Sequence, residues 1–278
     1  MIELLQQSFV QNAFLAGTVI AIITGIVGYF VVLRSQAFAA ESLSCIGFAG
    51  ATGAALLGIS SLLGMLGFTV LAALGIGALE KRLKGRDVEI GMVLSLALGL
   101  GVLFLRLYTT GATEAVGVLF GSILSVTKTD VWLTLIFSGV VLAALSFVFR
   151  PLLFMSIDPE VAEARGVPVK LLGIIFMLIL AVTVAESIQV IGVLLVFALL
   201  IAPAATAQHL TKSPLYGILL SVILGLVFTW GGLLLALVSR FPISFYISSL
   251  AGLTYFVTVS ISHRIVPHKL QEAIDHHT

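Results

Sequence analysis

The chain has 278 residues, of which 60% are hydrophobic and 10% are charged, and its formal net charge is +1. A soluble domain carries about 25% charged residues, so this composition excludes a soluble globular protein, and the balanced charge gives no basic surface for nucleic acid. One bilayer crossing takes about 20 apolar residues. The chain, residues 1–278, is therefore predicted to form a single transmembrane domain with no room for a soluble ATP-hydrolysing domain.

Apolar runs of helical length follow one another along the chain. In order they are Asn12–Leu33, Ala40–Ile59, Leu62–Leu79, Ile90–Leu107, Val131–Phe149, Val169–Val184, Ile188–Ala205, Leu215–Val238 and Ile243–Ile261. Met1–Gln11 lacks the basic segment and cleavage site of a signal peptide, so the first run is predicted to be a retained crossing. The sequence predicts an all-α, polytopic membrane helical bundle of about nine transmembrane helices, or about eight if Val169–Val184 merges with its neighbour.

The basic residues predict the orientation of the bundle, because cytoplasmic loops collect Lys and Arg. With an odd number of crossings and an external N-terminus, only Arg106, Lys128 and Arg240 fall outside. The remaining Lys and Arg residues fall on the cytoplasmic side: Arg34, Lys81, Arg82, Lys84, Arg86, Arg150, Arg165, Lys170, Lys212, Arg264 and Lys269. The C-terminus is therefore predicted to lie inside the cell.

The predicted crossing Ala40–Ile59 begins with polar residues and continues with small ones. Glu41 and Cys45 are four residues apart, so in a helix their side chains lie on one face, one turn apart. Thiolate suits zinc, and carboxylate also accepts manganese and iron, so the pair is predicted to form a transient substrate-metal site, supported by Ser42 and Ser44. A purely structural role stays open, because a free cysteine is usually a small buried hydrophobic residue and Glu41 could reach interfacial water.

The two longest polar connections are Tyr108–Asp130, predicted to be external, and Ser156–Pro168, predicted to be internal. The internal segment predicts a short helix, because aspartate is a good N-cap, proline suits the first helical position and glycine ends helices. Such a charged cytoplasmic helix is what a permease offers to a soluble motor, and a solvated loop helix is the alternative. The residues assigned to this docking role are Asp158, Pro159, Glu160, Glu163, Ala164, Arg165 and Gly166.

Glu186 is a second and weaker metal candidate. We expect it at a tight outer turn between two crossings, where a glutamate is usually solvated. A carboxylate that faces the translocation path is the alternative, since ionisable groups inside a membrane are functional candidates by default.

No motif indicates an enzyme. The sequence lacks the P-loop pattern G-x-x-x-x-G-K-[ST], the zinc-protease pattern H-E-x-x-H and the nucleophile-elbow pattern G-x-S-x-G. We therefore expect no catalytic residue and no permanently bound cofactor, and ATP hydrolysis, if it drives the protein, must reside on a separate chain.

Three segments, in this order, resemble the permeases of zinc- and manganese-type ATP-binding-cassette (ABC) importers. They are F-A-A-E-S-L-S-C-I-G-F-A-G-A-T-G-A-A-L-L-G (38–58), D-P-E-V-A-E-A-R-G-V-P (158–168) and V-I-G-V-L-L-V-F-A-L-L-I-A-P-A-A-T-A (190–207). The resemblance implies a type II importer-like bundle in the cytoplasmic membrane of a bacterium or archaeon, and a homodimer with a central path. It also implies two copies of a cytoplasmic ATPase that dock on 158–168, and an extracytoplasmic metal-binding protein that delivers the ion.

One departure from the family pattern affects the metal. The family usually has Asp or His at the position of Glu41, and His at the position of Cys45. Because a cysteine is a ligand only when it ionises near the metal, the metal stays open, with zinc expected ahead of manganese and iron. Two other functions also stay open: a permease for iron chelates or cobalamin, and a membrane transporter or scaffold that works without an ATPase.

Overall fold

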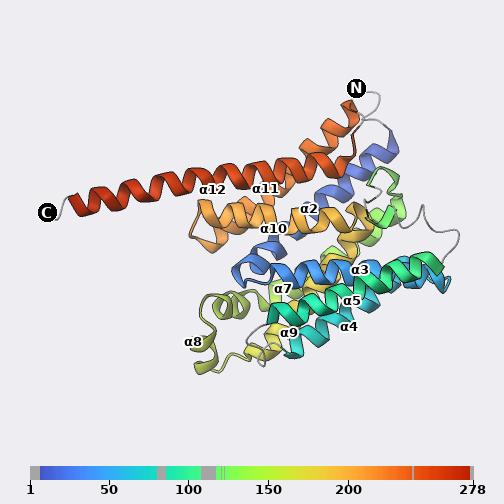
Figure 1. Cartoon of the computed structure of the whole chain (residues 1–278), viewed down its shortest axis with the longest axis horizontal. Coiled ribbons are helices and arrows are strands. Elements are labelled where there is room, and N and C mark those ends of the chain that lie inside the picture. The colour runs from blue at the N-terminus through green and yellow to red at the C-terminus, as the bar shows by residue number, and fades with distance from the viewer. Residues whose placement is uncertain are drawn as a thin grey trace.

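The computed structural model describes residues 7–79, 86–107, 117–119, 121, 123–239 and 241–275. These ranges contain helices and no β-strand, which confirms the all-α prediction (Figure 1). The elements are α2 (Ser8–Leu33), α3 (Ala37–Leu56), α4 (Ser61–Leu79), α5 (Arg86–Leu107), the 3-10 turn η1 (Ile123–Ser125), α7 (Lys128–Ile157), α8 (Pro159–Ala164), α9 (Val169–Ile191), α10 (Val193–Leu210), α11 (Pro214–Val238) and α12 (Ile243–Asp275).

Seven helices within the described ranges are long and apolar enough to cross a membrane. They are α2, α5 from Ile90, α7, α9, α10, α11 and α12 up to Ile261. The other two predicted crossings correspond to α3, which is rich in small and polar residues, and to α4, whose apolar part is Ser61–Gly77. The multi-pass membrane character is therefore confirmed, whereas the number of nine crossings remains a prediction.

Helices α2 and α9 lie at the centre of the bundle, since 67% and 72% of the residues in their most apolar stretches are buried. Their contact includes Phe30 of α2 and Phe176 of α9, whose ring centroids lie 6.3 Å apart. Phe149 of α7 meets Phe30 edge to face at 5.6 Å. These three rings join α2, α7 and α9 into one packed unit.

Small residues set the closest helix contacts, as expected where lipid removes the hydrophobic drive for helices to associate. A Cβ at Gly28 of α2 would overlap the carbonyl oxygen of Leu200 in α10. Gly50 of α3 and Gly64 of α4 face each other in the same way, because a Cβ on either would overlap the backbone of the other. Substitution at these glycines therefore forces the helix backbones apart.

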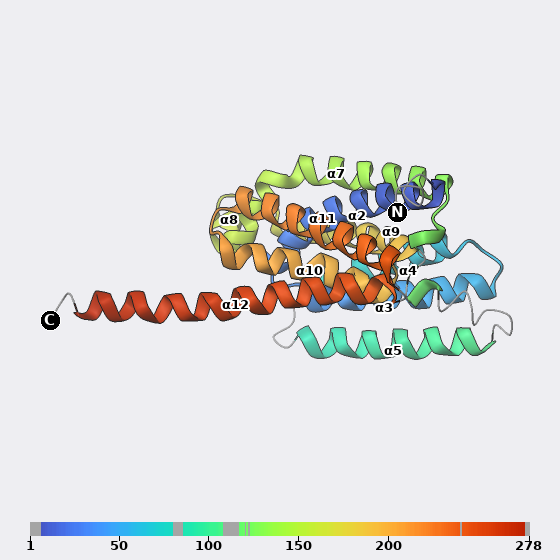
Figure 2. The same cartoon turned by 90° about the horizontal axis from the view of Figure 1, so that it is seen from above.

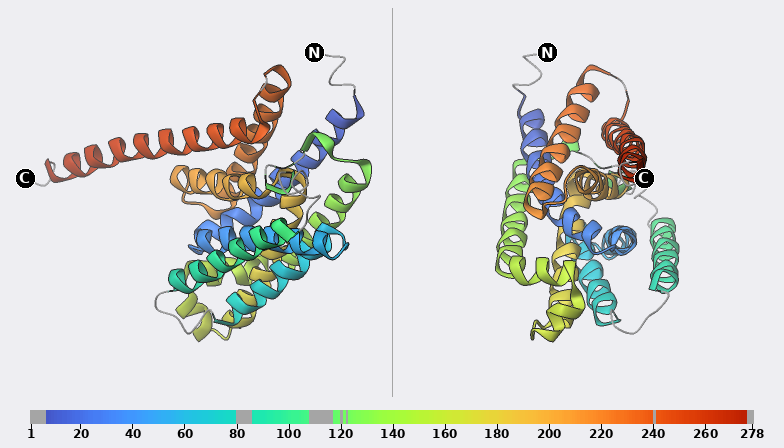
Figure 3. Two further views of the ribbon diagram at one scale, coloured as in Figure 1. Left: turned by 45° about the vertical axis from the view of Figure 1, so that its right-hand side comes forward. Right: turned by 90° about the vertical axis from the view of Figure 1, so that its left-hand side faces the viewer.

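Helix α5 packs mainly on α3 and stands apart from the rest of the bundle (Figures 2 and 3). The contact again uses glycine: a Cβ at Gly101 of α5 would lie 2.8 Å from the ring of Phe48 in α3. At the other end of the same contact, a Cβ at Gly91 would lie 3.5 Å from the ring of Phe38. The outward face of α5 is left uncovered by the described chain.

Helix α8 and the C-terminal half of α12 lie at the same end of the molecule (Figures 1 and 2). The 33 residues of α12 correspond to a helix of about 50 Å, and α12 continues well beyond the other helices at this end. This end is the one that the distribution of Lys and Arg predicts to be cytoplasmic.

The glycine pair between α3 and α4 allows a direct test of this packing. Gly64→Ala is expected to destabilise the protein by about 1–3 kcal/mol, because overpacking shifts the backbone. Gly67→Ala, on the same helix with nothing within 4 Å of the added Cβ, is the matched control and is expected to leave stability unchanged. The measurement is the thermal midpoint in detergent, and equal midpoints for the two variants would contradict the packing described.

Candidate functional site

Glu41 and Cys45 lie on one face of α3, as their spacing predicts. The Cys45 thiol donates to Glu41 Oε1 at a sulfur–oxygen distance of 3.9 Å. The Cys45 side chain is buried, with 6% exposed, and Glu41 Oε2 is buried without a hydrogen-bond partner among the described atoms. A carboxylate oxygen and a sulfur are therefore presented side by side, and one oxygen has unused capacity to bind a ligand.

The pair lies on the side of α3 that meets α5. Phe38 and Phe48 flank it along the helix, and both contact glycines of α5. At 100° per residue, Cys45 falls inside the arc of α3 that these two phenylalanines define. Glu41 and Cys45 therefore lie on the side of α3 that faces α5.

The described residues contain no group of three or more His, Cys, Asp or Glu side chains that could hold a metal ion. A closed four-ligand site, as in structural zinc proteins, is therefore not formed by these residues.

Glu186 does not lie in a solvated turn, so that prediction was wrong. It is inside α9 with 3% of its surface exposed, and Ser138 of α7 donates a hydrogen bond to its Oε1 at 2.5 Å. The helix continues to Ile191 and breaks only at Gly192, where φ is +83°. The sequence reading placed the break too early because Glu186, Ser187 and Gln189 interrupt the apolar run there.

The structure does not bring Glu186 to the Glu41–Cys45 pair. Ile188 of α9 faces α3, because a Cβ at Gly47 of α3 would lie 2.7 Å from the Ile188 side chain. Residues two apart in a helix do not share a face, and Glu186 points to α7. The three metal candidates of the sequence therefore divide into one pair and one separate residue.

The short helix predicted in 156–168 is confirmed as α8. Asp158 ends α7 and caps α8, since its Oδ1 accepts the backbone N–H of Val161 at 3.0 Å. Pro159 occupies the first helical position, and Gly166, at φ +81°, follows the C-cap Arg165. The guanidinium of Arg165 lies 5.8 Å from the ring centroid of Phe154. Asp158, in an extended conformation, is the single residue between α7 and α8, so the two helices are joined without a longer loop.

A groove of about 390 Å³ lies between α8 and the turn from α2 to α3. The sequence predicted a cytoplasmic connection here, between the runs that end at Leu33 and begin at Ala40, but not that this turn faces α8. Ser35 adopts φ +53° there. The groove is lined by Leu33, Arg34, Ser35, Gln36, Met155, Ser156, Pro159, Glu160, Glu163 and Val169.

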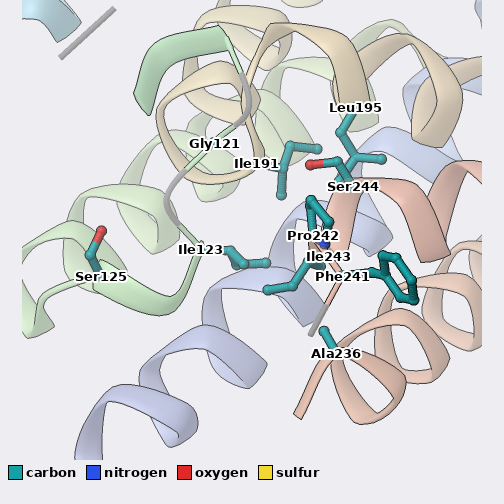
Figure 4. Close-up of a pocket in the computed structure, with 10 residues that line it drawn as sticks. All are labelled: Gly121, Ile123, Ser125, Ile191, Leu195, Ala236, Phe241, Pro242, Ile243 and Ser244. Carbon is teal, nitrogen blue, oxygen red and sulfur yellow. The ribbon is translucent and has the colours of Figure 1, made fainter. Parts of the chain in front are cut away.

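A larger pocket of about 620 Å³ lies at the opposite end of the bundle (Figure 4). Ile191 and Leu195, at the junction of α9 and α10, line one side, and the turn from Phe241 to Ser244 lines the other. Gly121 completes it, and a Cβ there would overlap the carbonyl group of Ile191. Of the predicted outer connection, residues 108–116, including Glu114, lie outside the described residues.

A multi-pass bundle of apolar helices with a short charged helix at one end is typical of the membrane subunit of a transporter. Residues 6–262 match the model of the ABC 3 transport family. The chain belongs to this family, and it is a membrane permease subunit without catalytic activity of its own, since the ATPase of an ABC transporter is a separate subunit.

Named relatives extend along nearly the whole chain. The manganese transport system membrane protein MntC of Listeria monocytogenes is 31% identical over 257 residues, which are 92% of this chain and 89% of the relative. The manganese import system permease protein ScaB of Streptococcus parasanguinis is 33% identical over 268 residues, 96% and 94% of the two chains.

Solved structures agree with this assignment. PsaBC from Streptococcus pneumoniae, in complex with Fab, superposes with a TM-score of 0.83 at 28% identity and covers 92% of this chain and 93% of that one. A chain described as a metal-chelate type ABC transporter in an inward-facing conformation shares the fold with a TM-score of 0.68 at 18% identity, covering 90% and 85%.

Proposed function

We propose that the chain is the permease of an ATP-driven importer for a divalent transition metal ion, with manganese as the main substrate. The observation that carries this proposal is the Glu41–Cys45 pair, two adjacent metal-binding side chains inside the membrane domain of an ABC permease. Manganese replaces the zinc preference of the sequence reading, because the named relatives that extend along the chain are manganese systems. The carboxylate suits manganese, and the thiol extends the site to softer ions.

The proposed transport cycle uses the pair as a transient site. Glu41 contributes a carboxylate oxygen, Cys45 contributes sulfur when it ionises beside the metal, and water can complete the coordination. Glu186 is left out of this site because it faces α7, away from α3. Weak, incomplete coordination allows the ion to be released to the cytoplasm.

The proposed complex contains two copies of the permease, two cytoplasmic ATPase subunits and an extracytoplasmic metal-binding protein. The ATPase is proposed to dock at α8, whose Glu160, Val161 and Glu163 are exposed. A capped helix joined to α7 through the single residue Asp158 is suited to carry the movement of a docked motor into the bundle. The N-terminus is proposed to lie outside and the extended C-terminal helix inside, where Lys and Arg accumulate.

Transport of metal chelates is a weaker alternative. A fold shared with a metal-chelate type transporter at 18% identity says nothing about the substrate, and a chelate needs no metal ligands from the protein. Growth that depends on free manganese supports metal import, and growth that depends on an iron chelate or cobalamin supports the alternative. Membership of the ABC 3 transport family argues against a transporter that works without an ATPase.

Replacing either metal-binding side chain is the direct test of the proposal. Glu41→Ala and Cys45→Ala are each expected to lower manganese uptake by about tenfold, because losing one ligand of a two-ligand site removes about 1.4 kcal/mol or more of binding. Uptake is measured with radioactive manganese in cells that depend on this importer.

Ser44→Ala is the matched control for these variants. The sequence predicted that Ser44 supports the metal site, but its buried hydroxyl donates to the carbonyl oxygen of Ala40 in its own helix at 3.2 Å rather than to Glu41 or Cys45. This variant should transport normally. Unchanged uptake in both Glu41→Ala and Cys45→Ala would remove the pair from the mechanism.

The thiol also predicts how the transporter responds to soft metals. Cadmium is expected to inhibit manganese uptake in the natural protein, because thiolate binds soft ions tightly. Cys45→Ser should weaken this inhibition by about tenfold while keeping most manganese uptake, since oxygen ligands suit manganese. The measurement is the cadmium concentration that halves manganese uptake. Identical values for the two proteins would show that sulfur does not contact the ion.

The cap of α8 tests the docking proposal. Asp158→Ala removes the N-cap and is expected to cost about 1 kcal/mol of helix stability. The amount of ATPase that co-purifies in mild detergent should then fall by about fivefold. Asp158→Ser keeps a capping oxygen and should retain the ATPase. Equal recovery of the ATPase with all three proteins would place docking elsewhere.

A further inference from the structure

Two hydrogen bonds join α7 to α9, one between Ser138 and Glu186 and one between Asp130 and Gln189. This polar seam belongs neither to the Glu41–Cys45 pair nor to the docking helix α8. Ser138 of α7 and Glu186 of α9 are each 97% buried, with 3% exposed, and their hydrogen bond is 2.5 Å long. Nearer the helix ends, Gln189 Nε2 donates to Asp130 Oδ1 at 3.3 Å. Burying a carboxylate inside a membrane domain costs free energy, so such a residue is a functional candidate by default.

One end of α7 is joined to the docking helix. Asp158 is shared by α7 and α8, and Arg165 at the end of α8 reaches back to the ring of Phe154 in α7. The 30 residues of α7 span about 45 Å, which is the thickness of a bilayer with its interfaces. A displacement of α8 is therefore applied to a helix that reaches the far end of the bundle.

Helix α9, the second helix of the polar seam, ends at the pocket that Ile191 lines. Glu186 lies less than two turns before Gly192, where α9 gives way to α10. Ile191 lines the pocket of about 620 Å³ and touches Gly121. The seam thus connects the helix that carries α8 with the helix end that shapes the pocket.

We propose that Glu186 is a positioning residue that binds α7 to α9 through Ser138, so that movement of α8 changes the pocket at Ile191. The proposal rests on the proposed function, in which an ATPase moves α8. It assigns Glu186 a hydrogen-bonding role rather than a metal-binding one, because its Oε1 accepts from Ser138 of α7 and because α3, which carries the Glu41–Cys45 pair, lies on another face of α9. Glu186 Oε2, like Glu41 Oε2, is buried without a hydrogen-bond partner among the described atoms.

The test measures the pocket directly in the reconstituted permease–ATPase complex. Spin labels are placed at Ser125→Cys and Phe241→Cys, two exposed positions on opposite sides of the pocket, in a Cys45→Ser background. The label separation is compared without nucleotide and after trapping with ATP and vanadate. We expect trapping to shift the separation in the parent complex and in Glu186→Gln, because the amide oxygen still accepts the Ser138 hydrogen bond.

Glu186→Leu and Ser138→Ala should abolish this shift while ATP hydrolysis stays within about twofold of the parent value. Ser146→Ala is the matched control on α7, because its hydroxyl bonds only to the carbonyl oxygen of Leu142 in the same helix, and it should shift normally. A normal shift in Glu186→Leu would overturn the proposal. Loss of the shift in Glu186→Gln would also overturn it, because the charge rather than the hydrogen bond would then be required.

Manganese uptake by proteoliposomes with Cys45 intact separates this inference from the proposed function. Glu186→Leu should reduce uptake by about tenfold, within the range of energetic coupling between protein sites, and Glu186→Gln should retain it. If the natural complex takes up no manganese but its pocket still responds to nucleotide, the proposed substrate fails and the role of Glu186 stands. If the parent pocket does not respond to nucleotide, the coupling proposal fails whatever the substrate.

Discussion

The absence of water around the helices is the constraint on which the rest of this structure depends. In lipid, an apolar helix face gains little by leaving its surroundings, so helices associate where their backbones approach closely or where polar groups pair. Gly28 against Leu200 and Gly50 against Gly64 are contacts of the first kind. The Ser138–Glu186 hydrogen bond is a contact of the second kind. The bundle is thus specified by a few small and polar residues within a largely apolar sequence.

The lipid environment also limits where charged functional groups can lie. Carboxylates inside membrane helices are rare, and the two that stand out, the half-buried Glu41 and the buried Glu186, have different partners. Each has one carboxylate oxygen that is buried without a partner among the described atoms. The other oxygen accepts from the Cys45 thiol of the same helix in Glu41, and from the Ser138 hydroxyl of another helix in Glu186. A ligand group and a packing group are distinguished by these partners and not by residue type.

Much of the architecture could be predicted from the sequence. The apolar runs located the long helices, because hydrophobic length is the dominant signal in a membrane protein, but two of them ended early, at Phe149 instead of Ile157 in α7 and at Val184 instead of Ile191 in α9. Asp158, Pro159 and Gly166 located α8, because capping and positive φ are local properties of the chain. Glu186 was misplaced, because polar residues close to a helix end look the same whether they face water or a neighbouring helix. The connection at Arg34–Gln36 was predicted, but the groove that it forms with α8 was not, because that groove depends on how segments distant in the sequence pack.

Composition alone predicts that the protein lies in a membrane and that its apolar runs are helices. The helical repeat predicts that Glu41 and Cys45 share one face. Only the tertiary structure decided that Glu41 and Cys45 lie towards α5, that Glu186 lies towards α7, and that the two groups do not form one site. The reason is physical: the direction in which a side chain points along its helix is local, but the neighbour that it meets depends on how helices distant in the sequence pack.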